Sequence, residues 1–345
     1  GCTVDATTGM FVGQAIRFDG NATAAIAGKC RFLTAVNTST KAVTWAPPLG
    51  SAPASTDTIN LGFGWVQTTV NELSVSAFQD FNILVKAASG IWINSGKITI
   101  PGPGGHVKMS FNGTGCGKYS MGGQAASLGT CLVGDDHIHL AAGDGKKFFI
   151  TADTPPLYFR IEDEIVKGTL VATDLMSIAR AQKSSSAAEH ATASVIVPWR
   201  PTRTLTGSPI FTSSGETLLD GAAFKIHNAG IDIDNGNVAR DEYVGNIYQS
   251  ETPYRSGMNP FKCKLSLSGR LTKEYLAQHG GALAAGTHTF FASVGNAAFK
   301  RFLVYIPKWM PNIMPLEGGD DEMMLNQDGD CLETAGLDVA YLGTV

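Results

Sequence analysis

The sequence is poor in charge. Charged residues make up 16% of its 345 residues and hydrophobic residues 43%, whereas an average protein is about a quarter charged. This composition excludes an intrinsically disordered chain. The 26 basic and 30 acidic side chains give a formal net charge of −4, so binding of nucleic acid through its phosphates is not expected. Such a surface suits a protein covered by copies of itself, or is simply a neutral β-rich surface.

Long hydrophobic runs and cysteine motifs are also absent. No apolar run approaches the roughly 18 residues of a membrane helix and no signal peptide is visible, so no membrane partner is expected. The cysteines lack Cys-x-x-Cys spacing, and we expect buried free thiols, although their even number leaves disulfides open. Because the chain begins with Gly1, we expect its native start to be processed or missing. The six cysteines are Cys2, Cys30, Cys116, Cys131, Cys263 and Cys331.

Motifs of the common enzyme classes are missing. The sequence contains no HExxH, Walker A, GxGxxG or GxSxG motif. Pro101–Gly105 lacks the Lys-Ser/Thr pair and the helix of a phosphate-binding loop, so we interpret it as a turn. No carboxylate pair, Ser-His-Asp set or Cys-His pair can be assembled. We therefore predict that the protein is not an enzyme, and we assign no catalytic, cofactor-binding or metal-binding residue and no cofactor.

One histidine pair has metal-site spacing. His137 and His139 are two residues apart, so in a strand both imidazoles would lie on one face and could meet a metal ion. No third ligand is identifiable from the sequence. An exposed polar loop is the favoured interpretation of this segment.

Two acidic groups are candidates for cation sites. Asp232 and Asp234 fail the EF-hand pattern, because Asn237 and Tyr243 stand where it needs glycine and glutamate. We assign these aspartates to the polar face of a strand that enters a tight hairpin at Asn235–Asn237. The second group is interpreted as a solvated loop or as charge that faces a channel. It comprises Asp320, Asp321, Glu322, Asp328 and Asp330.

Glycine, in contrast, is abundant. The 40 glycines and 15 prolines indicate many tight turns and short strands. In several segments apolar and polar residues alternate with period two, as in antiparallel sheets with one buried face. Phe302–Ile306, closed by Pro307, predicts a strand buried on both faces. The apolar members of the alternating segments are Val107, Met109 and Phe111; Phe224 and Ile226; Ile231 and Ile233; and Phe261, Cys263, Leu265 and Leu267.

One short helix is predicted. Thr272 caps its start, Leu271 packs on Leu276 as a hydrophobic staple, and Gly280-Gly281 ends it. It precedes the apolar strand Thr289–Val294. The predicted fold is mainly β, an antiparallel sandwich or barrel with one flanking helix and small inserted β modules.

Two regions have the pattern of insertions, and their shared order of strands and turns hints at an internal repeat. Within residues 12–60 the candidate strands are Gln14–Asp19, Cys30–Val36 and Ala42–Trp45, the last two separated by a turn at Asn37–Thr40. Within residues 155–200 they are Tyr158–Ile161, Glu164–Val171, Met176–Ala179 and Val195–Val197. Gln182–Ser194 is expected to be a flexible loop because small residues dominate it.

Several of these segments resemble bacteriophage major tail tube proteins. Ile178–Ala181 and Ala188–Ala191, within Ile161–Val197, resemble a small β module common in phage tail proteins. Lys97–Ile100 and Val107–Thr114 match the strand pair in the first half of the tail tube core. The second half is matched by Gly230–Asn237 leading into Arg240–Gly245, by Cys263–Leu271, by Arg301–Lys308, and by Gly318–Asn326 followed by Leu337–Tyr341.

The resemblance covers residues 61–125 and 205–345 and rests on strand order. It implies six subunits in a ring, rings stacked into a tube in the virion, and assembly in the host cytoplasm. The implied partners are other copies and tail proteins such as the tape measure, terminator, baseplate and sheath, while genomic DNA passes through without sequence-specific binding. The implied domains are a core remnant (1–11), an inserted β module (12–60), core (61–135), an inserted β module with the flexible loop (136–204), and core (205–345).

Two other functions remain open. A tail terminator or distal tail protein would share the fold and form a single ring. A secreted β-rich adhesin or carbohydrate-binding module would use aromatic side chains such as Trp45, Trp65 and Trp92 for stacking on sugars, although core packing is the commoner use of tryptophan. Disulfides among the cysteines would favour the secreted protein.

Overall fold

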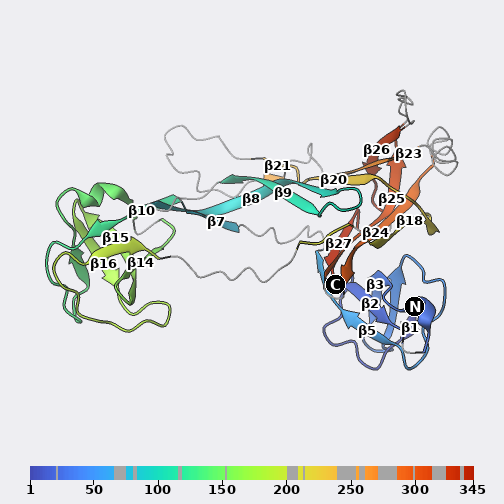
Figure 1. Cartoon of the computed structure of the whole chain (residues 1–345), viewed down its shortest axis with the longest axis horizontal. Coiled ribbons are helices and arrows are strands. Elements are labelled where there is room, and N and C mark those ends of the chain that lie inside the picture. Colours follow the sequence, from blue (N-terminus) through green and yellow to red (C-terminus); the bar gives the residue numbers. More distant parts are fainter. Residues whose placement is uncertain are drawn as a thin grey trace.

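The computed structural model is elongated and mainly β in the residues that it describes (Figure 1). It describes residues 1–20, 22–65, 75–80, 84–115, 119–151, 154–199, 209–212, 214–238, 254–255, 261–270, 286–297, 300–312, 324–334 and 338–345. Within them the helices are two short 3₁₀ turns, η1 (Ala24–Ile26) and η2 (Asp144–Lys147). None of these helices is long and apolar enough to cross a membrane. The predicted mainly β, antiparallel class is confirmed.

The first part is an N-terminal module, residues 2–61. Its five strands are ordered β1-β4-β3-β2-β5, and the Asn37 carboxamide accepts backbone N–H groups of Ser39 and Thr40 in the predicted turn between β3 and β4. Residues 1–11 were expected to be a remnant of the core, but β1 pairs with β4 and belongs to this module. The strands are β1 (Cys2–Thr3), β2 (Ala15–Asp19), β3 (Cys30–Asn37), β4 (Ala42–Ala46) and β5 (Thr58–Leu61).

The second part is the central sheet of 14 strands. Its main path runs β13-β10-β8-β20-β23-β26-β25-β24-β18-β19, and β6, β7, β9 and β27 join at its sides. The strands are β6 (Phe63–Trp65), β7 (Val75–Asp80), β8 (Leu84–Ile100), β9 (Lys108–Gly115), β10 (Tyr119–Gly123), β13 (Phe148–Phe149), β18 (Gly215–Leu219), β19 (Ala222–Ala223), β20 (Asn228–Asp234), β23 (Lys262–Arg270), β24 (His288–Ala297), β25 (Lys300–Pro311), β26 (Met324–Cys331) and β27 (Tyr341–Thr344). A separate pair is formed by β21 (Asn237–Val238) and β22 (Tyr254–Arg255).

The central sheet folds over its own apolar face. Ile231 of β20 and Leu265 of β23 share one core cluster with Val304 of β25, so the two halves of the sheet pack on each other. The predicted alternation in β20 and β23 is therefore confirmed. Phe224 is buried and Lys225 exposed, as predicted, but these residues follow β19 in irregular backbone.

Strand β25 is buried on both faces, as predicted. Val304 faces the first cluster, while Leu303 and Tyr305 pack with Phe32 of the N-terminal module on the other side. The strand does not end at Pro307 but continues to Pro311. Its pairing with β24 shifts register between His288 and Phe290, so the proline lies at an irregularity where a ladder hydrogen bond is not needed.

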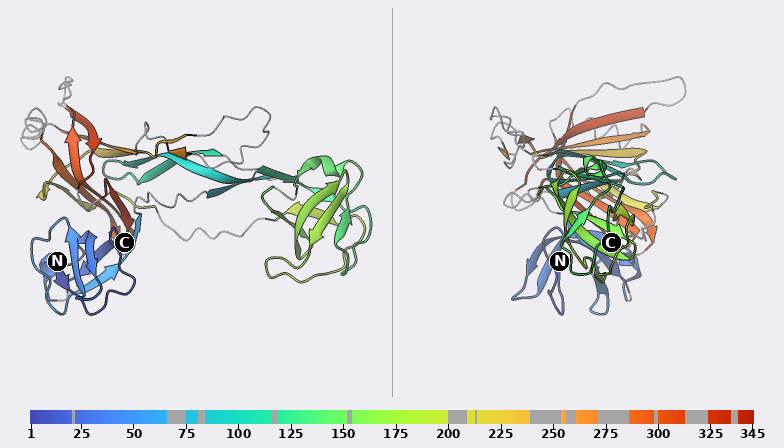
Figure 2. Two further views of the ribbon diagram at one scale, coloured as in Figure 1. Left: turned by 180° about the vertical axis from the view of Figure 1, so that it is seen from behind. Right: turned by 90° about the vertical axis from the view of Figure 1, so that its left-hand side faces the viewer.

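Strands β7 to β10 form a long arm that leaves the body of the molecule (Figures 1 and 2). Lys97–Ile100 of β8 and the beginning of β9 pair as predicted. The predicted burial of one face of β9 is wrong, because Met109 and Phe111 are 41% and 56% exposed. In the described part of the chain, β9 pairs with β8 alone and no second layer covers it.

The arm carries the third part, a distal module at the end far from the body (Figure 2). Its sheet order is β11-β17-β14-β15-β16-β12, and the Ser127–Leu140 bridge joins the two outer strands, so the sheet curls back on itself. The module begins at β11, earlier than the expected boundary at residue 136. Its strands are β11 (Ala125–Ala126), β12 (His137–His139), β14 (Leu157–Ile161), β15 (Glu164–Ala172), β16 (Leu175–Ala179) and β17 (Val195–Pro198).

The two modules share one topology, in agreement with the predicted repeat. Strands β12-β16-β15-β14-β17 of the distal module repeat the order β1-β4-β3-β2-β5 of the N-terminal module. Both modules also have a register shift in the equivalent hairpin. In the pair β3–β4 it lies between Leu33 and Ala35, and in the pair β15–β16 it lies between Leu170 and Ala172. The predicted helix at 272–280, Cys116, the segment Arg240–Gly245 and the acidic run 320–322 lie outside the described residues.

Candidate functional site

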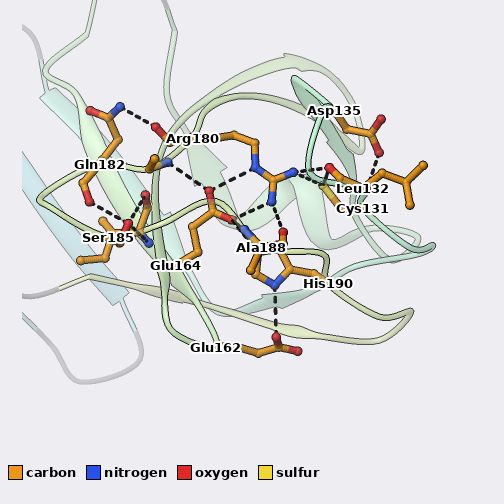
Figure 3. Close-up of polar contacts among 12 residues, drawn as sticks. Cys131, Leu132, Asp135, Glu162, Glu164, Arg180, Gln182, Ser185, Ala188 and His190 are labelled. Carbon is orange, nitrogen blue, oxygen red and sulfur yellow. Dashed lines mark hydrogen bonds and ion pairs between the residues drawn. The ribbon is translucent and has the colours of Figure 1, made fainter.

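A cluster of buried charged side chains lies in the distal module (Figure 3). Its centre is Glu164, the first residue of β15, which is 0% exposed and faces inward with Val166. Arg180 comes directly after β16, and His190 lies on the long connection to β17. A buried carboxylate requires cationic or N–H partners, and these three positions bring them together.

Glu164 accepts five hydrogen bonds. Arg180 donates from Nε to Oε1 at 3.1 Å and from Nη2 to Oε2 at 2.6 Å. The backbone amides of Ala181 and Ala188 donate at 3.0 and 3.1 Å, and Nε2 of His190 lies 2.9 Å from Oε2. Burial by itself raises the pKa of Glu164, but the hydrogen bonds prevail and hold it at about 2.

Arg180 uses its whole guanidinium group. Besides the two bonds to Glu164, it donates to the carbonyl oxygens of Leu132 and Ala188, and Nη1 lies 3.5 Å from the Cys131 thiol. Each of its five N–H groups therefore has an acceptor. The side chain ties the loop that follows β11 to the connection before β17.

His190 bridges two carboxylates. Its ring is 1% exposed and lies between Glu164 and Glu162, with Nδ1 3.2 Å from the Glu162 carboxylate. Ser194 donates to the other Glu162 oxygen at 3.0 Å. The connection 182–194, expected to be a flexible loop, is thus fixed along its length. Since Arg180 and His190 both bond to the buried Glu164, the cluster acts as a structural anchor.

The histidine pair lies nearby on β12, a short strand and not the expected loop. His137 and His139 share an exposed face and line a pocket with Cys131 and Asp135. His137 Nδ1 lies 2.5 Å from the Asp136 carboxylate. No group of three or more His, Cys, Asp or Glu side chains placed to hold a metal occurs among the described residues.

The aspartates of β20 lie on the polar face of the central sheet, as predicted. Oδ1 of Asp232 lies 3.6 Å from Nζ of Lys97 of β8. Gly236 has a φ of +66° and its N–H is accepted by Asp234. The turn does not form the expected hairpin, because β8 and β23 already occupy both edges of β20, and the next strand, β21, pairs elsewhere.

Asp328 and Asp330 were grouped with an acidic loop, but both lie on strand β26, within the central sheet. Asp330 pairs in register with Lys264 and Asp328 with Ser266, both of β23. Their carboxylates therefore share the face that holds Asp232.

Tryptophans and cysteines bear on the secreted alternative. Trp45 packs on Phe18 with ring centroids 5.0 Å apart and Trp92 is half-buried, whereas Trp65 of β6 is 51% exposed beside Phe63 at 77%. The cysteines in the described part of the chain are free thiols, namely Cys2, Cys30, Cys131, Cys263 and Cys331.

Comparison of the sequence with models of protein families and with curated proteins finds no match.

Proposed function

We propose that this chain is a structural subunit of a bacteriophage tail tube, which assembles as stacked rings around the channel for DNA. The observation that carries the proposal is strand β9. Its residues 108–113 are exposed on both faces, and its outer edge has no strand partner among the described residues. An open edge of this length offers unpaired N–H and C=O groups to a strand of another chain.

The side chains of β9 favour a protein partner over solvent. Met109 and Phe111 project from one face at 41% and 56% exposure, continuing the apolar side on which Ile98 and Ile231 form the core. A strand from a neighbouring copy would extend the sheet and cover these side chains. A head-to-tail contact of this kind generates closed rings or filaments.

The layering of the body supports the same arrangement. The N-terminal module covers the outer side of β24 and β25 through Ala15, Cys30 and Phe32. The polar side of β8, β20 and β23, in contrast, is uncovered by described residues. In a ring, the polar side would face the channel, and the N-terminal module would lie outside. Six copies per ring follow from the resemblance to tail tube proteins.

Electron microscopy of the purified full-length protein tests the proposal. We expect the wild type to form rings or tubes and Phe111→Lys to lose them, because the substitution places a charge in the contact between neighbouring copies. Asn112→Lys, on the other face of the same strand, is the matched control and should still assemble. A wild-type protein that stays monomeric at high concentration, even with other tail proteins, would refute the proposal. Single rings that never stack would indicate a terminator or distal tail protein.

One observation favours a second candidate, a carbohydrate-binding module. Phe63 and Trp65 expose two rings two residues apart on β6, a spacing that places them on one face for stacking on sugars. Glycan-array binding that is lost in Trp65→Ala would support it.

A further inference from the structure

The uncovered side of the central sheet carries charges in ordered rows. Across four neighbouring strands, the register places Lys97 of β8 opposite Asp232 of β20, Asp232 opposite Lys264 of β23, and Lys264 opposite Asp330 of β26. Directly opposed residues of an antiparallel sheet lie on one face. The four charges therefore alternate in sign along one line across the sheet.

The two flanking rows each hold one lysine and one aspartate, which lie on adjacent strands only in the first of these rows. On one side, Asp234 of β20 is opposite Lys262 of β23. On the other side, Lys108 of β9 begins a row that ends at Asp328 of β26. The three rows together hold four lysines and four aspartates, so their formal charges cancel. The lysines are Lys97, Lys108, Lys262 and Lys264, and the aspartates are Asp232, Asp234, Asp328 and Asp330.

Most of these side chains are open to solvent, while Asp328 and Asp330 are half-buried. Lys97 is 60% exposed and Asp232 46% exposed although they are 3.6 Å apart, and Lys262, Lys264 and Asp234 are also exposed. The opposite side of the same strands forms the buried core with β24 and β25. The rows thus form a broad, solvent-exposed surface that no layer covers in the described part of the chain.

Alternation has a specific consequence for a polyanion. Unpaired lysines would each neutralise a phosphate and release counterions, which adds up to strong, salt-dependent binding. When an aspartate lies on the adjacent strand, about 5 Å away, its electric field opposes that of the lysine. The two fields largely cancel within the Debye length of about 8 Å at physiological salt. A purely acidic face would place like charges on adjacent strands, which destabilises a sheet.

We propose that this face is the wall along which double-stranded DNA moves, and that the aspartates of β20 and β26 prevent the lysines of β8 and β23 from holding the phosphates. This inference rests on the proposed tail tube function. It assigns to Lys97, Lys262 and Lys264 a neutralising aspartate on an adjacent strand. Removal of these aspartates alone should therefore convert the wall into a DNA-binding surface.

The test compares DNA binding by full-length variants. In Asp232→Asn/Asp234→Asn/Asp330→Asn, fluorescence anisotropy with a labelled duplex at low salt should show binding at least tenfold tighter than wild type, and this binding should weaken steeply as salt is added. Adding Lys97→Gln, Lys262→Gln and Lys264→Gln to the same variant should abolish the gain. The control Asp5→Asn/Asp163→Asn/Glu189→Gln makes the same change in net charge at exposed positions elsewhere and should not bind.

Three results would overturn the inference. They are wild-type binding as tight as that of the triple variant, no gain in a triple variant with wild-type circular dichroism, and an equal gain in the Asp5/Asp163/Glu189 control. Micrographs of the wild type separate the two proposals. If the protein forms tubes but the triple variant shows no gain in DNA binding, the proposal about the channel wall is refuted and the tail tube proposal is not. If no ring or tube forms, both proposals are refuted.

Discussion

Glu164 and Arg180 form a bidentate ion pair that joins the first residue of β15 to the residue directly after β16. Their side chains are 0% and 11% exposed. A buried pair of this kind adds little stability compared with an apolar pair, but it specifies geometry, since each partner is costly to bury alone. Here it positions the connection to β17.

The first prediction concerns Glu164→Gln, which removes the charge that Arg180 faces. We expect a loss of about 3–5 kcal/mol in the unfolding free energy of the distal module, together with rapid proteolysis within residues 182–194. Glu189→Gln on the same connection is exposed and should behave like wild type. Equal protease resistance of all three proteins would show that the cluster is not the anchor.

The second prediction is a pH dependence. The pKa of Glu164 is about 2 in the folded protein and about 4.3 in an unfolded chain, so the unfolded state binds the proton first. The stabilisation is complete above about pH 4.3 and is lost as the pH falls towards 2. Denaturant titrations of wild type and Glu164→Gln should differ by a constant amount from pH 7 to 5 and converge below pH 4. A difference that does not vary with pH contradicts this explanation.

The third prediction concerns the junction of the N-terminal module with the central sheet. The Glu216 carboxylate of β18 accepts hydrogen bonds from Arg31 Nη1 at 2.8 Å and from Lys29 Nζ at 2.7 Å, and the Arg31 side chain is 3% exposed. Glu216→Gln leaves that guanidinium buried without its carboxylate, so we expect a loss of about 3 kcal/mol. Hydrogen exchange should accelerate in β2, β3 and β24. The exposed Glu333→Gln should leave exchange unchanged, and unchanged exchange in Glu216→Gln would argue against the ion pair as the clamp.

The fourth prediction concerns the contact between arm and distal module. A Cβ on Gly122 of β10 would lie 2.8 Å from the ring of Phe159, whereas one on Gly129 would meet nothing within 4 Å. Gly122→Ala should cost about 1–3 kcal/mol through overpacking, measured by thermal unfolding, and Gly129→Ala should cost far less. Equal melting temperatures for the two variants would rule out tight packing of the arm on Phe159.

Part of the charged cluster was visible in the sequence. Arg180 and His190 stood in the segments that resemble a phage β module, but nothing local indicated that they meet. The available signal was Glu164 itself, an acid on the inward side of a strand otherwise lined by Val166 and Gly168. Such a position predicts a buried cation partner, although not which one, because that partner is 16 residues away and set by the curl of the sheet.

Local pattern determined many of the strands of this protein, although not the short β12, which was expected to be a loop. Alternation in β20 and β23 and the turn signals of both modules placed the strands within a few residues, because side-chain direction in a strand repeats every two residues whatever the partners. Tertiary structure alone decided which strands are covered. Met109 and Phe111 alternate as regularly as Leu265 and Leu267, yet only the second pair is buried. Burial depends on a second layer, which the described residues form over β23 and not over β9.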